Sequence, residues 1–296
     1  MQEIVLSAIN IYPIKSLGGI ALKEAKVEPR GLQYDRRWLL VDEDHTFLTQ
    51  REYPRMALCS IRLRAEGLEA SAPGMKPLLI PFRLRNPATT VTVKIWKSIC
   101  EAVMVGEFAD AWFSRFLGTS CRLVHMPDET RREVNPEYAV GDAIVSFADG
   151  YPFHLIGESS LRDLNGRLDG SLLMNRFRPN FVVTGSLAYD EDRWRRIRIG
   201  ATHFHVVKPC ERCVITTIDQ AAGERTGQEP LKTLAQYRAV NNNVLFGQYL
   251  IADREGGILR VGDRIQVIER RNGENDLHPR DGERRASAPA AAQRVD

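Results

Sequence analysis

Cys210 and Cys213 stand three residues apart, and they are the clearest candidates for chemistry in the sequence. A Cys-x-x-Cys spacing is typical of a redox dithiol or of half a zinc site. A thioredoxin-like dithiol needs a helix after its first cysteine, whereas β-branched residues follow Cys213. A zinc site needs a second ligand pair at matching spacing, and the nearby His203 and His205 only alternate along an expected strand. A single thiolate remains, and it suits a metal held mainly by another group, such as a cofactor.

The residues around this pair bear on its reactivity. Arg212 precedes Cys213, and because a guanidinium favours an ionised thiol, we expect Arg212 to keep the Cys213 sulfur charged. The chain has five cysteines, and the other three are isolated at positions 59, 100 and 121. So sparse a set is not a disulfide framework, and it predicts a reducing compartment.

Three basic residues fall near the ends of expected strands. Lys15 comes just after one strand, and Arg36 is expected at the start of another. Arg178 precedes a proline, which favours an extended backbone. Arginine binds phosphate through a planar fork and lysine acts as a point charge, so the three together could hold an anionic cofactor. Each one alone is more often a solvated surface charge.

Short apolar segments predict a strand-rich chain, with the clearest at residues 38–41, 91–93, 181–183, 204–207 and 214–217. Helical spacing is limited to three apolar stripes that we expect to pack into the core. They are Phe108, Trp112 and Phe116 before a stop at Gly118; Leu161, Leu164 and Leu168; and Leu231 and Leu234. This pattern predicts a mainly β protein with some α (α+β), built from barrels rather than a doubly wound sheet.

Composition limits the function classes. The net charge of +3 over 296 residues is too small to indicate a nucleic-acid-binding surface. No apolar run approaches the roughly 18–20 residues that span a bilayer, and the N-terminus lacks the pattern of a signal peptide. The sequence therefore predicts a cytoplasmic protein that binds neither nucleic acid nor membrane.

Composition also suggests where the chain divides. It turns polar after residue 125, and from residue 270 it is rich in Arg, Gly, Ala and acidic residues, with almost no large apolar side chains. We predict one domain over residues 1–125, a second over 126–269, and a disordered tail over 270–296.

Six segments, in order, resemble MOSC proteins that carry an N-terminal β-barrel domain. They are Tyr12–Ser16, Asp35–Trp38, Phe177–Asn180, Lys208–Cys213, Thr216–Asp219 and Leu245–Tyr249. Their order and spacing resemble those of the mitochondrial amidoxime-reducing component and bacterial YcbX-like proteins. The resemblance implies that the first predicted domain is a MOSC N-terminal β-barrel domain and the second a MOSC β-barrel domain. A molybdenum cofactor, the metal bound to molybdopterin, would lie in the cleft between them.

The resemblance also implies roles for individual residues. It puts the molybdenum-ligating, catalytic cysteine at Cys213 rather than Cys210. Positions that grip the pterin and its phosphate are Lys15, Ser16, Arg36 and Arg178. Further cofactor contacts are implied at Asn180, Glu211, Arg212 and Tyr249, and pocket-lining positions at Asp149, Gly150 and Tyr151.

The resemblance has four departures. The mitochondrial proteins carry an N-terminal membrane anchor, whereas here the matching strand is expected to begin at once. Tyr151 is bulkier than the small residues common there, and Leu187 replaces a polar or acidic residue. No cysteine follows Cys213, so the chain cannot bind an iron–sulfur cluster of its own in an appended ferredoxin domain. We therefore expect a separate electron donor: a ferredoxin, a flavin reductase or a haem carrier.

The implied activity is the molybdenum-dependent reduction of N–O bonds in amidoximes, hydroxylamines and N-hydroxylated bases. One alternative is a carrier of sulfur or of the molybdenum cofactor, with Cys213 as a persulfide. Another is a structural or interaction β-barrel whose cysteines are inert. Bound molybdenum and pterin would support the first reading, labile sulfur on Cys213 the second, and neither the third.

Overall fold

The computed structural model describes residues 3–84, 89–253 and 257–271. Within them the fold is mainly β with some α, as the sequence predicts. Its last strand continues through Arg270, the first residue of the predicted tail, and residues 272–296 of that tail lie outside the described residues.

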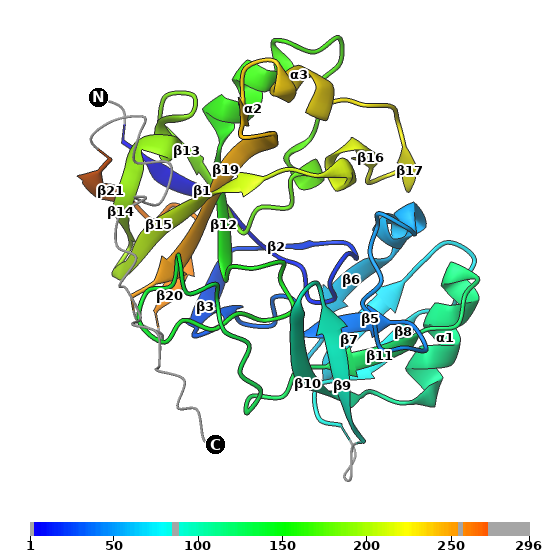
Figure 1. The fold of residues 1–296 in the computed structure, drawn as a ribbon. Helices are drawn as coiled ribbons and strands as arrows, with labels where there is room; N and C mark the ends of the chain where they lie inside the picture. Colours follow the sequence, from blue (N-terminus) through cyan, green and yellow to red (C-terminus); the bar gives the residue numbers. More distant parts are fainter. Residues whose placement is uncertain (1–2, 85–88, 254–256, 272–296) are drawn as a thin grey trace, which may run out of the picture.

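A curved sheet of nine strands forms the larger part of the molecule (Figure 1). Its strands are β1 (Val5–Ile11), β2 (Ile20–Leu22), β12 (Phe153–Gly157), β13 (Phe181–Thr184), β14 (Trp194–Ile199), β15 (Thr202–Glu211), β18 (Ala239–Val240), β19 (Asn243–Ala252) and β21 (Ile265–Arg270). They are ordered β2-β1-β13-β12-β19-β15-β14-β21, and β18 pairs with β19. Neighbouring strands run antiparallel except β12 and β13, which are parallel.

The smaller part contains two sheets packed with helix α1 (Glu107–Leu117) (Figure 1). One sheet is ordered β5 (Trp38–Val41), β11 (Arg122–His125), β10 (Ser98–Met104), β9 (Thr90–Ile95), and the other β6 (Ser60–Leu63), β7 (Gly67–Ser71), β8 (Leu78–Pro81). Two short sheets join β20 (Ile258–Arg260) to β3 (Glu24–Glu28) and β4 (Gly31–Leu32), and β16 (Ile218–Asp219) to β17 (Glu224–Arg225). The remaining helices are α2 (Glu158–Asn165), α3 (Leu231–Ala235) and the 3-10 turns η1 (Pro54–Leu58), η2 (Met174–Arg176), η3 (Asp190–Arg193) and η4 (Val214–Thr217).

The chain's first strands belong to the larger part. Strand β1 pairs with β13, and β3 pairs with β20, so residues near the N-terminus pair with strands from much later in the chain. The segments after β1 and β4 then lead into the smaller part. These crossings bring Lys15 and Arg36 beside residues of the second half of the chain.

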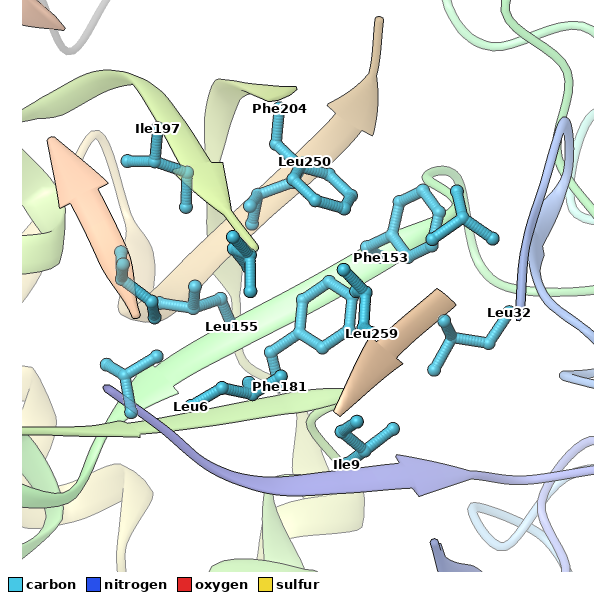
Figure 2. Packing of buried hydrophobic residues seen from close by; sticks show 14 of the residues in the cluster. Leu6, Ile9, Leu32, Phe153, Leu155, Phe181, Ile197, Phe204, Leu250 and Leu259 are labelled. Carbon is cyan, nitrogen blue, oxygen red and sulfur yellow. The ribbon is translucent and has the colours of Figure 1, made fainter. Parts of the chain in front are cut away.

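The core of the larger part is built around aromatic rings (Figure 2). Phe153 stacks on Phe181 at 5.5 Å between ring centroids, and Phe204 meets both edge-on. All three are almost fully buried, as are Leu6, Leu155 and Leu250 beside them. Each such side chain contributes about 2 kcal/mol by leaving water. This core fixes the strands whose ends carry the site.

Four of the strands named from sequence are confirmed, but the one at residues 214–217 is wrong. These residues form the 3-10 turn η4. The hydroxyl of Thr216 donates to the carbonyl of Cys213 at 2.9 Å, and that of Thr217 to the carbonyl of Val214 at 2.8 Å. Threonine can thus stabilise a turn locally, despite the strand preference of its branched side chain. Arg36 also differs from expectation, because it lies in a turn and β5 begins two residues later.

The helix predicted from Phe108, Trp112 and Phe116 is α1, and it ends at Gly118 with φ +73°, as expected. Phe108 is nevertheless 48% exposed, so it does not join the core. The buried face of the helix instead includes Ala109, Phe113 and Phe116. Among the described residues, every helix is too short or too polar to cross a membrane.

Candidate functional site

A cleft lies where the two parts of the molecule meet. Its walls come from the turns after β1 and β4, the loop between β5 and η1, the loop before β12 and β12 itself. The segment after η2, the end of β15, the η4 turn and strand β19 complete them. The cleft has a volume of about 100 Å³ and is partly open to solvent. It is lined by Lys15, Ser16, Arg36, Arg51, Ala148, Asp149, Tyr151, His154, Phe177, Arg178, Asn180, Cys210, Glu211, Arg212, Cys213, Ile215 and Tyr249.

Lys15 sits at the base of one wall, almost completely buried. Its ammonium is 2.6 Å from Oδ1 of Asp149, in the loop before β12. Burial lowers the pKa of Lys15 to about 8, because desolvation disfavours the charged form more than Asp149 favours it. Burial acts to raise the pKa of Asp149, but the charge and hydrogen bond of Lys15, the charge of Arg51 and the hydrogen bond of Trp96 together lower it.

Arg36 and Arg178 both pack on the Tyr12 ring, with Cζ atoms 4.4 Å and 4.2 Å from its centroid. Arg36 donates to the buried Asp35 carboxylate at 2.6 Å and to Asn180 at 3.2 Å. Burial acts to lower the pKa of Arg36, but Asp35 outweighs it and the pKa is raised. Burial lowers the pKa of Arg178 to about 10. Both arginines are therefore charged near pH 7, and they place two positive charges beside Tyr12.

Three of the residues that line the cleft have a left-handed backbone conformation, which residues other than glycine rarely adopt. The φ angles are +67° for Ser16, +50° for Arg36 and +55° for Arg178. Each such conformation costs on the order of 1 kcal/mol or more for a non-glycine residue. Strain of this kind clusters at ligand-binding sites, because the surrounding fold holds the residues in place for another purpose.

The thiol of Cys213 stands at the turn between β15 and η4, partly exposed and in no disulfide. Its basic neighbour is Arg51, whose Nη2 lies 3.2 Å from Sγ. Arg212 was expected to keep the Cys213 sulfur charged. Its own hydrogen bonds go to the sulfur of Cys210 at 2.8 Å and to the carbonyl of Phe177 at 2.9 Å. Arg212 and Cys210 share one side of the extended segment, because alternate residues point the same way. The charge of Arg212 also interacts with Cys213, which helps to raise the pKa of Arg212.

The remaining wall of the cleft is aromatic. Tyr151 stacks on Tyr249 at 4.7 Å between centroids, and His154 packs against Tyr249 at 5.6 Å. Burial, aided by the charges of Arg212 and Arg36, lowers the pKa of His154 well below its usual value. Burial also raises the pKa of Tyr249. Both side chains are therefore neutral near pH 7, so this wall offers hydrogen bonds and stacking rather than charge.

Of the residues predicted for the site, all but Gly150 line the cleft. A Cβ at Gly150 would meet nothing within 4 Å, so no close contact requires glycine there. Leu187 is 81% exposed and is not among the lining residues. The roles of the lining residues remain predictions.

Sequence reasoning missed Arg51 and His154. Arg51 lies in an ordinary polar segment, and His154 inside a buried strand. No spacing in the sequence connects either residue to the Cys-x-x-Cys segment, so only the fold reveals them.

The donors in the cleft fit an anionic group bound near the Cys213 sulfur. Five cationic side chains line it against two carboxylates. Arg51, Arg178 and Arg212 each keep one buried N–H without a hydrogen-bond partner among the described residues. Leaving such donors unpaired costs about 1–3 kcal/mol each, so a phosphate or another oxyanion would relieve the cost. In the same described ranges, no group of three or more His, Cys, Asp or Glu is placed to hold a metal ion.

The fold and cleft define a class: a two-part β protein with a free thiol in a cation-lined cleft. The models of two protein families match the chain, the MOSC N-terminal beta barrel domain over residues 3–120 and the MOSC domain over residues 142–266. The chain belongs to the MOSC family, in the group that carries both domains.

Curated relatives agree with this assignment. The chain is 36% identical to mitochondrial amidoxime reducing component 2 of Rattus norvegicus, over 90% of this chain and 84% of that protein. It is 32% identical to mitochondrial amidoxime-reducing component 1 of Homo sapiens, over the same shares of the two chains. Among solved structures, the YuaD protein of Bacillus subtilis matches 90% of this chain and 97% of its own at 11% identity, with a TM-score of 0.40.

Proposed function

We propose that this protein is a molybdenum-cofactor-dependent reductase of N-hydroxylated compounds, with Cys213 as the thiolate that ligates the metal. The observation that carries the proposal is the free, partly exposed thiol of Cys213 in a cleft lined by five cationic side chains. The family match and the relatives named as amidoxime-reducing components support the same activity.

The net reaction takes two electrons and two protons, converting R–NHOH into R–NH₂ and water. A bound molybdenum cofactor supplies the two-electron chemistry. The chain's residues do the binding: Lys15, Arg36 and Arg178 hold the anionic end, and Tyr249 and Tyr151 form a neutral wall. Asn180 fixes Arg36 at 3.2 Å and accepts from the backbone N–H of His154 at the same distance. Cys213 would ligate the metal through its thiolate.

Electrons come from a separate protein in this proposal. Residues 214–296 contain no cysteine, so this segment supplies no thiolates for an iron–sulfur cluster. A ferredoxin, a flavin reductase or a haem carrier would dock at the open side of the cleft. The substrate is a small N-oxygenated molecule.

The direct test is molybdenum content by elemental mass spectrometry, on protein made in a host that synthesises the cofactor. Near-stoichiometric metal, together with benzamidoxime reduction by an artificial donor, is the expected result. Metal-free protein from such a host would contradict the proposal. Labile sulfur on Cys213 of that protein would favour a sulfur-carrier function instead.

A further inference from the structure

Arg51 combines two properties, and no other cation that lines the cleft in the described structure has both. Its Nη2 donates to Sγ of Cys213 at 3.2 Å. Its Nη1 is buried and has no hydrogen-bond partner within the described part of the chain. The Nη1 donor is therefore held near the Cys213 sulfur without an acceptor.

The other cations of the cleft are engaged elsewhere or lie away from the thiol. Lys15 is paired with Asp149, and Arg36 with Asp35. Arg212 donates to Cys210, and Arg178 packs on Tyr12. None of these four donates a hydrogen bond to Cys213 in the described structure. Arg51 is therefore the cation placed beside the proposed metal ligand, where a substrate would bind.

The indole ring of Trp96 packs against the guanidinium of Arg51. The Arg51 Cζ lies 4.6 Å from the centre of the indole, within cation–π range. The indole N–H donates to Oδ1 of Asp149 at 3.1 Å, and Phe47 packs edge-on against the ring at 4.9 Å. Trp96 is fixed at three points although its side chain is 44% exposed.

The backbone conformation of Trp96 is also unusual for a tryptophan. It occupies the tight turn between β9 and β10 with φ +55°, a conformation that favours glycine in two-residue hairpins. A bulky residue there is strained, so the turn alone does not account for tryptophan. Its contacts with Arg51 and Asp149 do.

We propose that Arg51 binds the oxygen of the substrate's N–O group beside Cys213, and that Trp96 is a positioning residue for Arg51. This inference rests on the proposed function. An N-hydroxyl oxygen accepts a hydrogen bond, whereas the reduced product has lost that oxygen. Binding the product would leave the Nη1 donor of Arg51 unpaired, so the site distinguishes substrate from product and favours product release.

The test measures equilibrium binding to the oxidised holoenzyme with no electron donor present, so that no turnover occurs. The ligands are N4-hydroxycytosine and cytosine, a neutral pair that differs by the one oxygen. A hydrogen bond from a charged donor contributes about 1.5–3 kcal/mol, so wild-type protein should bind the hydroxylated base about 10–100 times more tightly. Arg51→Gln should abolish this preference while leaving the cytosine Kd within about twofold, because only the oxygen contact is lost.

Arg55→Gln is the matched control, because Arg55 is exposed and stacks on Phe116 away from the cleft. It should leave both Kd values unchanged. Trp96→Asn should reduce the preference and retain molybdenum, because asparagine tolerates a positive φ and keeps the turn. Arg51→Lys keeps the charge but lacks the planar, forked guanidinium, so it should also reduce the preference for N4-hydroxycytosine. It provides a second test if Arg51→Gln misfolds.

Molybdenum content of every variant separates the possible outcomes. Loss of metal in Arg51→Gln would overturn the inference, because Arg51 would then serve the cofactor or its thiolate ligand. Equal weakening of both bases, or an unchanged preference, would overturn it too. Wild-type protein with full metal that reduces no N-oxygenated compound would instead refute the proposed function.

Discussion

Nη2 of Arg51 lies 3.2 Å from Sγ of Cys213, although 162 residues separate them in the sequence. Arg51 belongs to the smaller part of the molecule, and Cys213 follows a strand of the nine-stranded sheet. The surroundings of the thiol therefore depend on how the two parts meet. A change that loosened their contact would alter the site without touching any residue named in it.

The two cysteines should differ sharply in their effect on metal binding. Cys210 is buried, its pKa is raised by burial, and Arg212 donates to its sulfur. Cys213→Ser should reduce molybdenum content to below about one tenth, because a metal ligand is lost. Cys210→Ser should retain most of the metal. Elemental mass spectrometry of both variants tests the assignment, and the reverse pattern would show that Cys210 is the ligand.

Arg178 should matter for holding the cofactor. Its Nη2 is buried and unpartnered among the residues that the structure describes, and it faces the cleft. Arg178→Gln should weaken cofactor retention about 10–100-fold, the value of one charged hydrogen bond. Arg198→Gln, which alters an exposed arginine on β14, is the control. Equal pterin release from the two purified variants would contradict the assignment.

Lys15 should make cofactor retention depend on pH. Its pKa is lowered to about 8 by burial, so the ammonium is charged below that pH and neutral above it. The grip on an anionic group should therefore weaken as pH rises from 7 to 9. Lys15→Arg should remove the effect, because arginine stays charged over this range. Pterin fluorescence released into solution reports retention, and an identical pH profile in the two proteins would refute the role of Lys15.

Glu191 should make folding stability depend on pH. This carboxyl is fully buried, accepting from the Gly157 N–H at 3.0 Å and the Ser160 hydroxyl at 2.7 Å. Burial, with the neighbouring Asp192 charge, raises its pKa from 4.5 to about 7. The folded state binds the proton more tightly, so stability is full below about pH 4.5 and declines until about pH 7.

The decline attributable to Glu191 is about 3 kcal/mol. Glu191→Gln should remove it, because the amide oxygen can still accept both hydrogen bonds without ionising. Urea denaturation at pH 5 and pH 8 measures the difference. A slope with pH that is the same in wild type and variant would show that Glu191 does not titrate in this range.

Much of the site could be predicted from the sequence. The residues at positions 12–16, 177–180 and 208–213 carry local signals, such as a proline after Arg178 and the Cys-x-x-Cys spacing. Short apolar segments rich in β-branched and aromatic residues also predicted strands such as β13 and β15, because these side chains pack well on a pleated sheet. The 3-10 turn after Cys213 was missed because threonine's local hydrogen bonds override its strand preference.

The sequence by itself determined the β-rich class, the candidate thiol and most of the cationic residues around it, because these depend on residue type and local spacing. Only the tertiary structure decided which cation meets which sulfur: Arg51 at Cys213 and Arg212 at Cys210. It also decided that Trp96 stacks on Arg51. Such pairings depend on side-chain direction and on the docking of distant strands, which alternation along a single strand does not encode.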